Sequence, residues 1–139
     1  MHADGGNESS MDEEINQITE KIIGCAFSVS NTLGSGFLEK VYENAMLIEI
    51  KAAGLKVEAQ KSIKVQYKGE IIGDYLADLL VENLVIVELK AVKAIDPNHV
   101  AQALNYLKAT GLEFALILNF GKPKVEIKRI VKSNEVRET

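Results

Sequence analysis

An acidic and a basic residue stand at the end of the most apolar segment of the chain. Glu88 and Lys90 follow the aliphatic residues 84–87 and are separated by Leu89. Side chains two positions apart on a β-strand point to the same face, so Glu88 and Lys90 are expected to lie side by side. Burying an unpaired carboxylate costs several kcal/mol. Glu88 therefore needs Lys90, a metal ion or water in a cleft as its partner.

A second carboxylate, Asp78, lies on the preceding predicted strand. Opposed residues of an antiparallel pair share a face, so Asp78 and Glu88 face together only if the loop between their strands has an odd length. Asn83 favours a three-residue loop over residues 81–83, because asparagine tolerates left-handed backbone. The Cβ atoms of the two acids would then be roughly 5–8 Å apart, close enough for the carboxylates to share a divalent cation.

The local pattern leaves two interpretations of these charges open. Asp78, Glu88 and Lys90 form either a structural ion-pair cluster or a metal site. Oxygen ligands favour Mg²⁺ or Mn²⁺, and the sequence has no Cys-rich or His-rich spacing of the kind that binds zinc. Cys25, the single cysteine, falls in an apolar helical stripe and is expected to be a buried, inert thiol.

Hydrophobic periodicity predicts the elements that must position these residues. Apolar residues at steps of three and four predict helices, and alternation at period two predicts strands. In chain order we expect helices over 10–33 and 37–53, strands over 57–67, 71–81 and 84–90, a helix over 97–110, and strands over 114–118 and 125–131. This order describes an α/β sandwich with a mixed sheet.

Capping signals and apolar stripes refine the three helices. Ser10 and Glu13 have the spacing of a capping box, and Asp96, Pro97 and Gly111 delimit the third helix. The expected buried stripe of the first helix is Ile15, Ile18, Ile22, Cys25 and Val29, and that of the second is Leu38, Val41, Ala45, Ile48 and Ala52.

Length and composition predict one domain. The chain has 139 residues, of which 47% are hydrophobic and 26% charged. We expect a disordered tail over 1–10, a single domain over 11–133 and a polar tail over 134–139. No apolar run approaches the roughly 18 residues that span a bilayer. The N-terminus lacks the pattern of a secretory signal, and with a single cysteine this predicts a cytoplasmic protein.

The formal net charge of −4 argues against a protein that binds nucleic acid by positive charge alone. The charge is unevenly distributed, because residues 1–50 carry nine acidic and two basic side chains, whereas residues 51–139 carry eleven and fourteen. A solvated mixed-charge surface is the default interpretation. The candidates for a basic surface are Lys51, Lys56, Lys61, Lys64, Lys68, Lys122, Lys124, Lys128, Arg129 and Lys132.

Four motifs occur in an order that resembles a known family. Residues 36–43 fit the pattern G-x-x-E-x-x-Y, and the motifs that follow are Ala77-Asp78-Leu79-Leu80, Val87-Glu88-Leu89-Lys90-Ala91 and Gln102-Ala103-Leu104-Asn105-Tyr106-Leu107. Together they resemble GxxExxY proteins, a branch of the PD-(D/E)XK nuclease superfamily, over about Ile15 to Val131. Two positions depart from the family pattern: Ala77 replaces the proline, and Ser30 stands where relatives often carry histidine. The resemblance implies a restriction-endonuclease-like α/β sandwich, a mixed central sheet flanked by helices.

The resemblance also implies roles for individual residues. Asp78 and Glu88 would be metal ligands for Mg²⁺ or Mn²⁺, with the Leu89 carbonyl as a third ligand and Glu39 as an extra acid from a helix. Lys90 would orient the attacking water or stabilise the charged transition state. Gln102 would lie beside the metal or the scissile phosphate.

Three further residues lie near these motifs. Tyr106 and Tyr42 could line the same cleft, although buried packing is the favoured interpretation for both tyrosines. His99 precedes Gln102 by three residues and is more simply interpreted as a surface or cap residue.

The function implied by the resemblance is divalent-metal-dependent hydrolysis of phosphodiester bonds in nucleic acid, with DNA favoured over RNA as the partner. Two alternatives remain. One is a catalytically inactive module on the same fold that binds nucleic acid or protein. The other is a domain that acts only within a homo-oligomer or a larger assembly, since its own surface is small and acidic.

Overall fold

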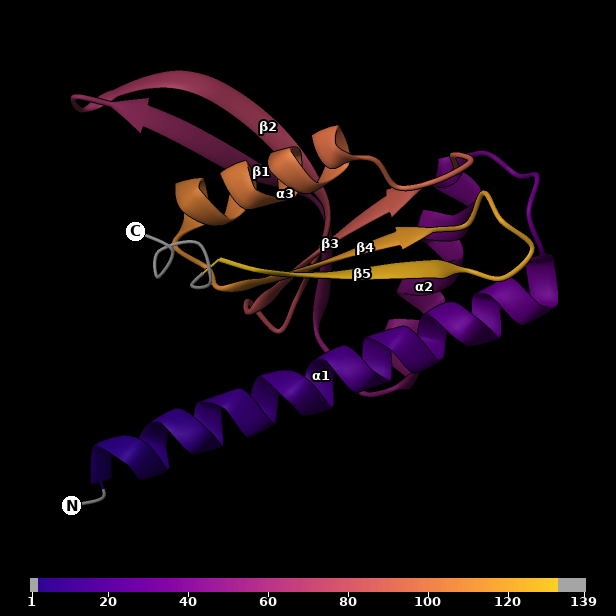
Figure 1. Cartoon of the computed structure of the whole chain (residues 1–139), viewed down its shortest axis with the longest axis horizontal. Helices are drawn as coiled ribbons and strands as arrows, with labels where there is room; N and C mark the ends of the chain where they lie inside the picture. Colours follow the sequence, from indigo (N-terminus) through magenta and orange to yellow (C-terminus); the bar gives the residue numbers. More distant parts are fainter. Residues whose placement is uncertain (1–2, 133–139) are drawn as a thin grey trace.

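One mixed five-stranded sheet, with strand order β1-β2-β3-β4-β5, forms the centre of the computed structural model, which describes residues 3–132 (Figure 1). Strands β3 and β4 are parallel, and the other neighbouring pairs are antiparallel. The elements are α1 (Ala3–Leu33), α2 (Glu39–Ala52), β1 (Val57–Tyr67), β2 (Glu70–Val81), β3 (Val85–Lys90), α3 (Pro97–Thr110), β4 (Phe114–Asn119) and β5 (Glu126–Val131). The predicted α/β architecture with a mixed sheet is confirmed.

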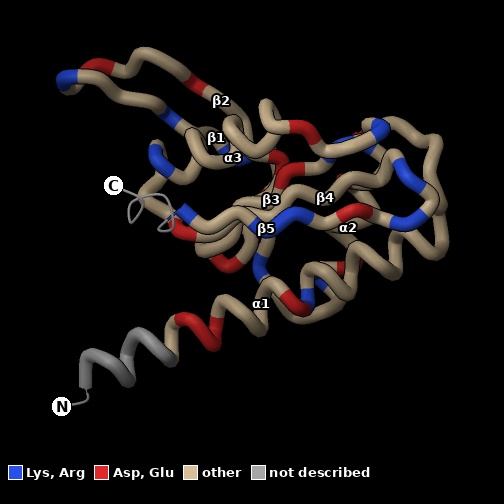
Figure 2. The backbone as a smooth tube through the Cα atoms, in the orientation of Figure 1, with Lys and Arg blue, Asp and Glu red and all other residues tan. Residues whose placement is uncertain are grey.

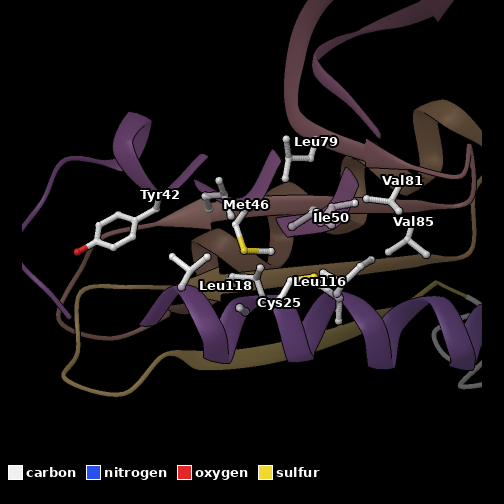
Figure 3. Close-up of a cluster of buried hydrophobic side chains, with 14 of the residues drawn as sticks. Cys25, Tyr42, Met46, Ile50, Leu79, Val81, Val85, Leu116 and Leu118 are labelled. Atoms are coloured by element: carbon white, nitrogen blue, oxygen red, sulfur yellow. The ribbon is translucent and has the colours of Figure 1, made fainter. Parts of the chain in front are cut away.

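The sheet separates two hydrophobic cores. Helices α1 and α2 cover one face, where Met46 and Ile50 pack with side chains of the central strands (Figure 3). Helix α3 covers the other face, and Ile86 belongs to that second core. Because side chains alternate along a strand, Glu88 and Lys90 have the same parity as Ile86 and lie on the α3 side of β3.

Strands β1 and β2 form a long hairpin that extends beyond the rest of the sheet and curves alongside α3 (Figure 1). Lys68 and Gly69 form its turn with φ values of 51° and 83°, in the gap between the predicted strands over 57–67 and 71–81. Only the inner end of β2 pairs with β3, through residues 79–81. The outer part of the hairpin is therefore free to form a wall opposite α3.

Helix α1 begins earlier than predicted. It starts at Ala3, so Ser10 and Glu13 lie within the helix, and the prediction of a capping box there is wrong. The expected disordered tail over residues 1–10 is helical from Ala3 onward. No proline interrupts this segment, so the backbone hydrogen bonds of the helix continue through it. The predicted polar tail over 134–139 lies outside the described residues.

Helix α2 buries a different face from the one predicted. Leu38, which precedes the helix, is 81% exposed and Ile48 is 69% exposed, whereas Tyr42, Met46 and Ile50 are completely buried. Apolar residues occur on two sides of this helix, so periodicity alone does not identify the buried side. The sheet receives the side with the larger Tyr42 and Met46. The predicted stripe of α1 is confirmed, from Ile15 at 5% exposure to Val29 at 4%.

Helix α3 begins and ends where the sequence predicts. The Asp96 side chain accepts hydrogen bonds from the N–H groups of Asn98 and His99, Pro97 is the first helical residue, and Gly111 adopts φ 79° at the end. None of the helices in the described part of the chain has the length and apolar character needed to span a membrane. Acidic residues gather on α1, whereas the hairpin carries both acidic and basic residues (Figure 2).

Candidate active site

The candidate site lies where β2 and β3 part. Their backbone pairing ends with Leu79 opposite Val87, and the same register places Asp78 opposite Glu88. Here the side-chain carboxylates accept hydrogen bonds from backbone N–H groups of the neighbouring strand. The Asp78 N–H donates to Glu88 Oε2 at 3.2 Å, and the Leu89 N–H donates to Asp78 Oδ2 at 2.7 Å. Each acid is therefore anchored by the backbone of the opposite strand.

The loop that sets this register has the predicted length but different residues. Val81 pairs with Val85, so the loop comprises residues 82–84 rather than 81–83. Glu82 and Asn83 both adopt left-handed backbone, with φ values of 53° and 55°. The odd length brings Asp78 and Glu88 to one face as expected, and the shift by one residue makes them directly opposed.

Burial and mutual repulsion perturb both acids. Glu88 is 5% exposed, and burial followed by the negative charge of Asp78 raises its pKa from 4.5 to about 8. Burial also raises the pKa of Asp78, while the hydrogen bond from Leu89 lowers it. Two adjacent carboxylates in a poorly solvated position favour binding a proton or a cation between them.

Lys90 acts on these acids at a distance. It lies partly buried at the end of β3, and its charge lowers the pKa of both Asp78 and Glu88. Among the described residues, no salt bridge joins Lys90 to either acid. The interpretation of the cluster as a structural ion pair therefore loses its main support, and the carboxylates remain available to a cation.

The N-terminus of α2 reaches the end of β3. Glu39, the first residue of α2, accepts a hydrogen bond on Oε2 from the Ala91 N–H at 3.3 Å. Its negative charge raises the pKa of Asp78 and of Glu88. The structure thus brings together three acids that are separated by up to 49 positions in the sequence, as Glu39 and Glu88 are.

The remaining residues of the G-x-x-E-x-x-Y pattern shape the loop that precedes Glu39. Gly36 has a φ of 115°, a backbone angle that residues other than glycine rarely adopt. The Tyr42 hydroxyl donates to the Gly34 carbonyl at 2.7 Å and accepts from the Phe37 N–H at 3.2 Å. The Tyr42 ring stacks on Phe120 with centroids 4.6 Å apart. Tyr42 is therefore a buried structural residue, as its favoured interpretation predicted.

Glu43 is a neighbour of the site that the sequence analysis missed. It is 4% exposed, is bound by Lys40 Nζ at 2.9 Å and by Gln60 Nε2 at 2.8 Å, and its charge raises the pKa of Asp78. Its spacing of four from Glu39 places both acids on one side of α2 and is the signal that could have identified it. Because Glu43 is already paired with Lys40 and Gln60, we expect it to act on Asp78 through its charge and not as a ligand for a cation.

Asn119 and Gly121 hold the segment that follows Lys90. The buried Asn119 side chain accepts from the Val92 N–H at 2.9 Å and donates to the Val92 carbonyl at 2.9 Å. A Cβ atom on Gly121 would lie 2.2 Å from the Val92 oxygen, so only glycine fits there. These contacts restrain the chain immediately after Glu88 and Lys90, and the sequence analysis singled out neither residue.

The candidate residues of α3 lie in three different surroundings. Tyr106 is 6% exposed and borders the acids: burial, followed by the charges of Glu88 and Asp78, raises its pKa to about 12. Gln102 is exposed and lines a groove between α3 and the hairpin. His99 Nδ1 accepts a hydrogen bond from the Asp96 N–H at 3.0 Å and completes a capping box, consistent with its interpretation as a cap residue.

The donor set fits a hard divalent cation. Asp78 and Glu88 each use one carboxylate oxygen in the hydrogen bonds described above, which leaves Oδ1 and Oε1 for a ligand. Over residues 10–132, whose side chains the structure describes, no group of three or more His, Cys, Asp and Glu side chains is arranged to hold a metal by itself. Mg²⁺ is commonly bound through one or two carboxylates together with water and substrate phosphate, so two opposed acids suffice as its protein anchor.

Comparison with known proteins agrees with this fold and motif order. Residues 16–130 match the family model of the PD-(D/E)XK nuclease superfamily, and the chain belongs to that superfamily. Among solved structures it is similar to an alkaline exonuclease, LHK-Exo, from Laribacter hongkongensis, with a TM-score of 0.53 and 15% sequence identity. The similarity covers 71% of this chain and 58% of the exonuclease chain, and at this identity it shows a shared fold. No curated protein matched the sequence.

Proposed function

We propose that the protein is a divalent-metal-dependent nuclease of the GxxExxY branch that hydrolyses phosphodiester bonds, with DNA favoured as its substrate. The observation that carries this proposal is the opposed pair Asp78 and Glu88, largely removed from solvent and hydrogen-bonded to each other's strands without a neutralising salt bridge. This pair lies within the superfamily's motif and next to Lys90. Its geometry supports metal binding better than a purely structural role.

Each residue has a defined task in the proposed reaction. Asp78 and Glu88, with the Leu89 carbonyl, would hold Mg²⁺ or Mn²⁺, and Glu39 would add negative charge beside them. When bound, such an ion polarises a phosphate oxygen and lowers the pKa of a coordinated water. The Lys90 ammonium would orient the attacking water or stabilise the negative charge that develops on the phosphate. Gln102, on the exposed side of α3, would position the phosphate by hydrogen bonding.

A cleavage assay with matched variants tests this proposal. Wild type, Glu88→Gln and Lys90→Ala are incubated with Mg²⁺ or Mn²⁺ and with labelled single-stranded, duplex and branched DNA and RNA. Glu113→Gln and Lys93→Ala are the controls, because both replace exposed residues of the same type. We expect loss of cleavage by about 100-fold or more in the two site variants and in neither control.

Two results would contradict the proposed chemistry. Cleavage that persists in Glu88→Gln would place the active centre elsewhere. Absence of cleavage by wild type on every substrate, together with absence of metal binding by calorimetry, would favour the inactive binding module. Size measurement in solution, repeated with substrate, tests whether cleavage requires an oligomer.

A further inference from the structure

A groove of about 860 Å³ runs between the β1–β2 hairpin and α3. The hairpin contributes Lys64, Gln66 and Tyr75, and α3 contributes Gln102, Asn105 and Lys108. Tyr106 also lines this groove and packs in the same core as Ile86, whose face of β3 carries Glu88. Burial, followed by the charges of Glu88 and Asp78, raises the pKa of Tyr106. The groove therefore ends beside the candidate active site, although none of the three site acids belongs to its lining.

Tyr75 is an aromatic side chain held in place but left accessible. It is 50% exposed, and its ring centroid lies 5.9 Å from that of Tyr106 at an angle of 44°. The ring also lies against Gly73, where an added Cβ would approach Tyr75 Cε2 to 3.2 Å. Contacts on two sides restrict the rotamers of Tyr75, so a ligand that stacks on its ring loses little of the binding energy to ordering the side chain.

The charge of the groove differs from that of the chain as a whole. Among the described residues that line it, none is acidic, whereas the chain carries a net charge of −4. Lys64 contacts Asp74 at 2.6 Å, so contact with an anion falls mainly to Lys108 in the last turn of α3. The neutral side-chain amides of Gln66, Gln102 and Asn105 offer both hydrogen-bond donors and acceptors.

An aromatic ring, neutral amides and a lysine together suit nucleobases attached to a phosphate backbone. Stacking on the Tyr75 ring in the groove requires an exposed base face, which bases inside a duplex do not present. We propose that this groove binds single-stranded nucleic acid, with a base stacked on Tyr75 and a phosphate near Lys108, and that it guides the strand to Asp78 and Glu88. Delivery to the acids rests on the proposed nuclease function, whereas binding in the groove does not.

Binding in metal-free buffer tests the groove separately from cleavage. Labelled single-stranded and duplex oligonucleotides are titrated with wild type, Tyr75→Leu, Tyr75→Phe and, as the matched control, Tyr67→Leu, since Tyr67 is 60% exposed on the same hairpin but does not line the groove. We expect Tyr75→Leu to weaken single-strand binding by roughly 5-fold to 100-fold. Tyr75→Phe and Tyr67→Leu should bind the single strand with an affinity within about 2-fold of that of wild type, because both variants retain the stacking ring at position 75.

Two further readouts distinguish stacking from a general loss of affinity. A 2-aminopurine base in the single strand should be quenched on binding wild type and Tyr75→Phe, and less so on binding Tyr75→Leu. Lys108→Ala should reduce the slope of log K against log salt by about 0.7 while leaving the quenching of bound 2-aminopurine intact.

The inference is overturned if Tyr75→Leu and Tyr67→Leu bind equally well, or if duplex binds as tightly as single strand. If Tyr75→Leu binds and cleaves like wild type while Glu88→Gln loses cleavage, the groove assignment fails and the proposed nuclease stands. If single-strand binding depends on Tyr75 but wild type cleaves nothing with either metal, the groove stands and the nuclease proposal fails.

Discussion

Replacing Glu88 by glutamine is expected to stabilise the metal-free protein increasingly as the pH rises. The pKa of Glu88 is about 8 in the folded protein and 4.5 without the fold's influence, so the folded state holds this proton more tightly than the unfolded state. Protonated Glu88 therefore contributes to the free energy of unfolding. This contribution is fully present below about pH 4.5 and is lost as the pH rises to about 8. Glutamine removes this loss and still offers an oxygen to the Asp78 N–H.

The size of the effect follows from the shift. Ionising Glu88 in the folded protein costs on the order of 4 kcal/mol between about pH 5 and about pH 9. For a domain of this size, that corresponds to a change on the order of 10 °C in Tm. The advantage of Glu88→Gln over wild type should therefore be small at the acidic end and reach several kcal/mol at the alkaline end.

Chemical denaturation with a chelator present measures this difference across the pH range. At each pH, the wild-type free energy of unfolding is subtracted from that of the variant. The difference removes the contribution of every titrating group that the substitution leaves unchanged. Glu113→Gln is the control, because it makes the same substitution at an exposed position. A Glu88→Gln difference that stays constant within about 0.5 kcal/mol over this range would refute a buried, repelled carboxylate at position 88.

Three further predictions concern metal binding and the support of the site. Mn²⁺ or Mg²⁺ at about 100 times its Kd should stabilise wild type by about 2.7 kcal/mol in thermal unfolding and should leave the stability of Asp78→Asn unchanged. Equal stabilisation of the two proteins would exclude Asp78 as a ligand. Gly121→Ala should destabilise the protein by about 2 kcal/mol or more in urea unfolding, because the new Cβ would lie 2.2 Å from the Val92 oxygen; unchanged stability would mean that this segment moves freely. Tyr42→Phe should cost about 1–2 kcal/mol by losing the hydrogen bonds to Gly34 and Phe37 while keeping the stack on Phe120, and full retention of stability would contradict the structural role of the hydroxyl.

Local chemistry made much of the fold predictable. The α3 boundaries follow from residues that act on their immediate neighbours, since Asp96 caps its own helix and Gly111 supplies the left-handed residue that ends it. The turn at Lys68 and Gly69 is equally local. The parity of the loop between β2 and β3 was also predictable, because Asn83 favours left-handed backbone and alternation along a strand has a fixed period.

Tertiary contacts decided what these local rules leave open. The buried side of α2 depended on which of two apolar sides the sheet accepts, and Tyr42 could be buried because Gly34 and Phe37 satisfy its hydroxyl. The start of α1 could not be located from Ser10, because a favourable cap does not stop a helix that no proline interrupts. In each case the outcome depends on contacts or continuity that no short window of sequence contains.

The chemistry of the candidate site divides in the same way. Residue types and strand faces are already identifiable in the amino-acid sequence, since alternation and motif spacing single out Asp78, Glu88 and Lys90. Only the tertiary structure brought Glu39 to the end of β3, buried Glu88 beside Asp78, and set Tyr75 against Tyr106 across the groove. Alternation is a property of the backbone, whereas burial, desolvation and the approach of distant charges exist only once the elements have packed.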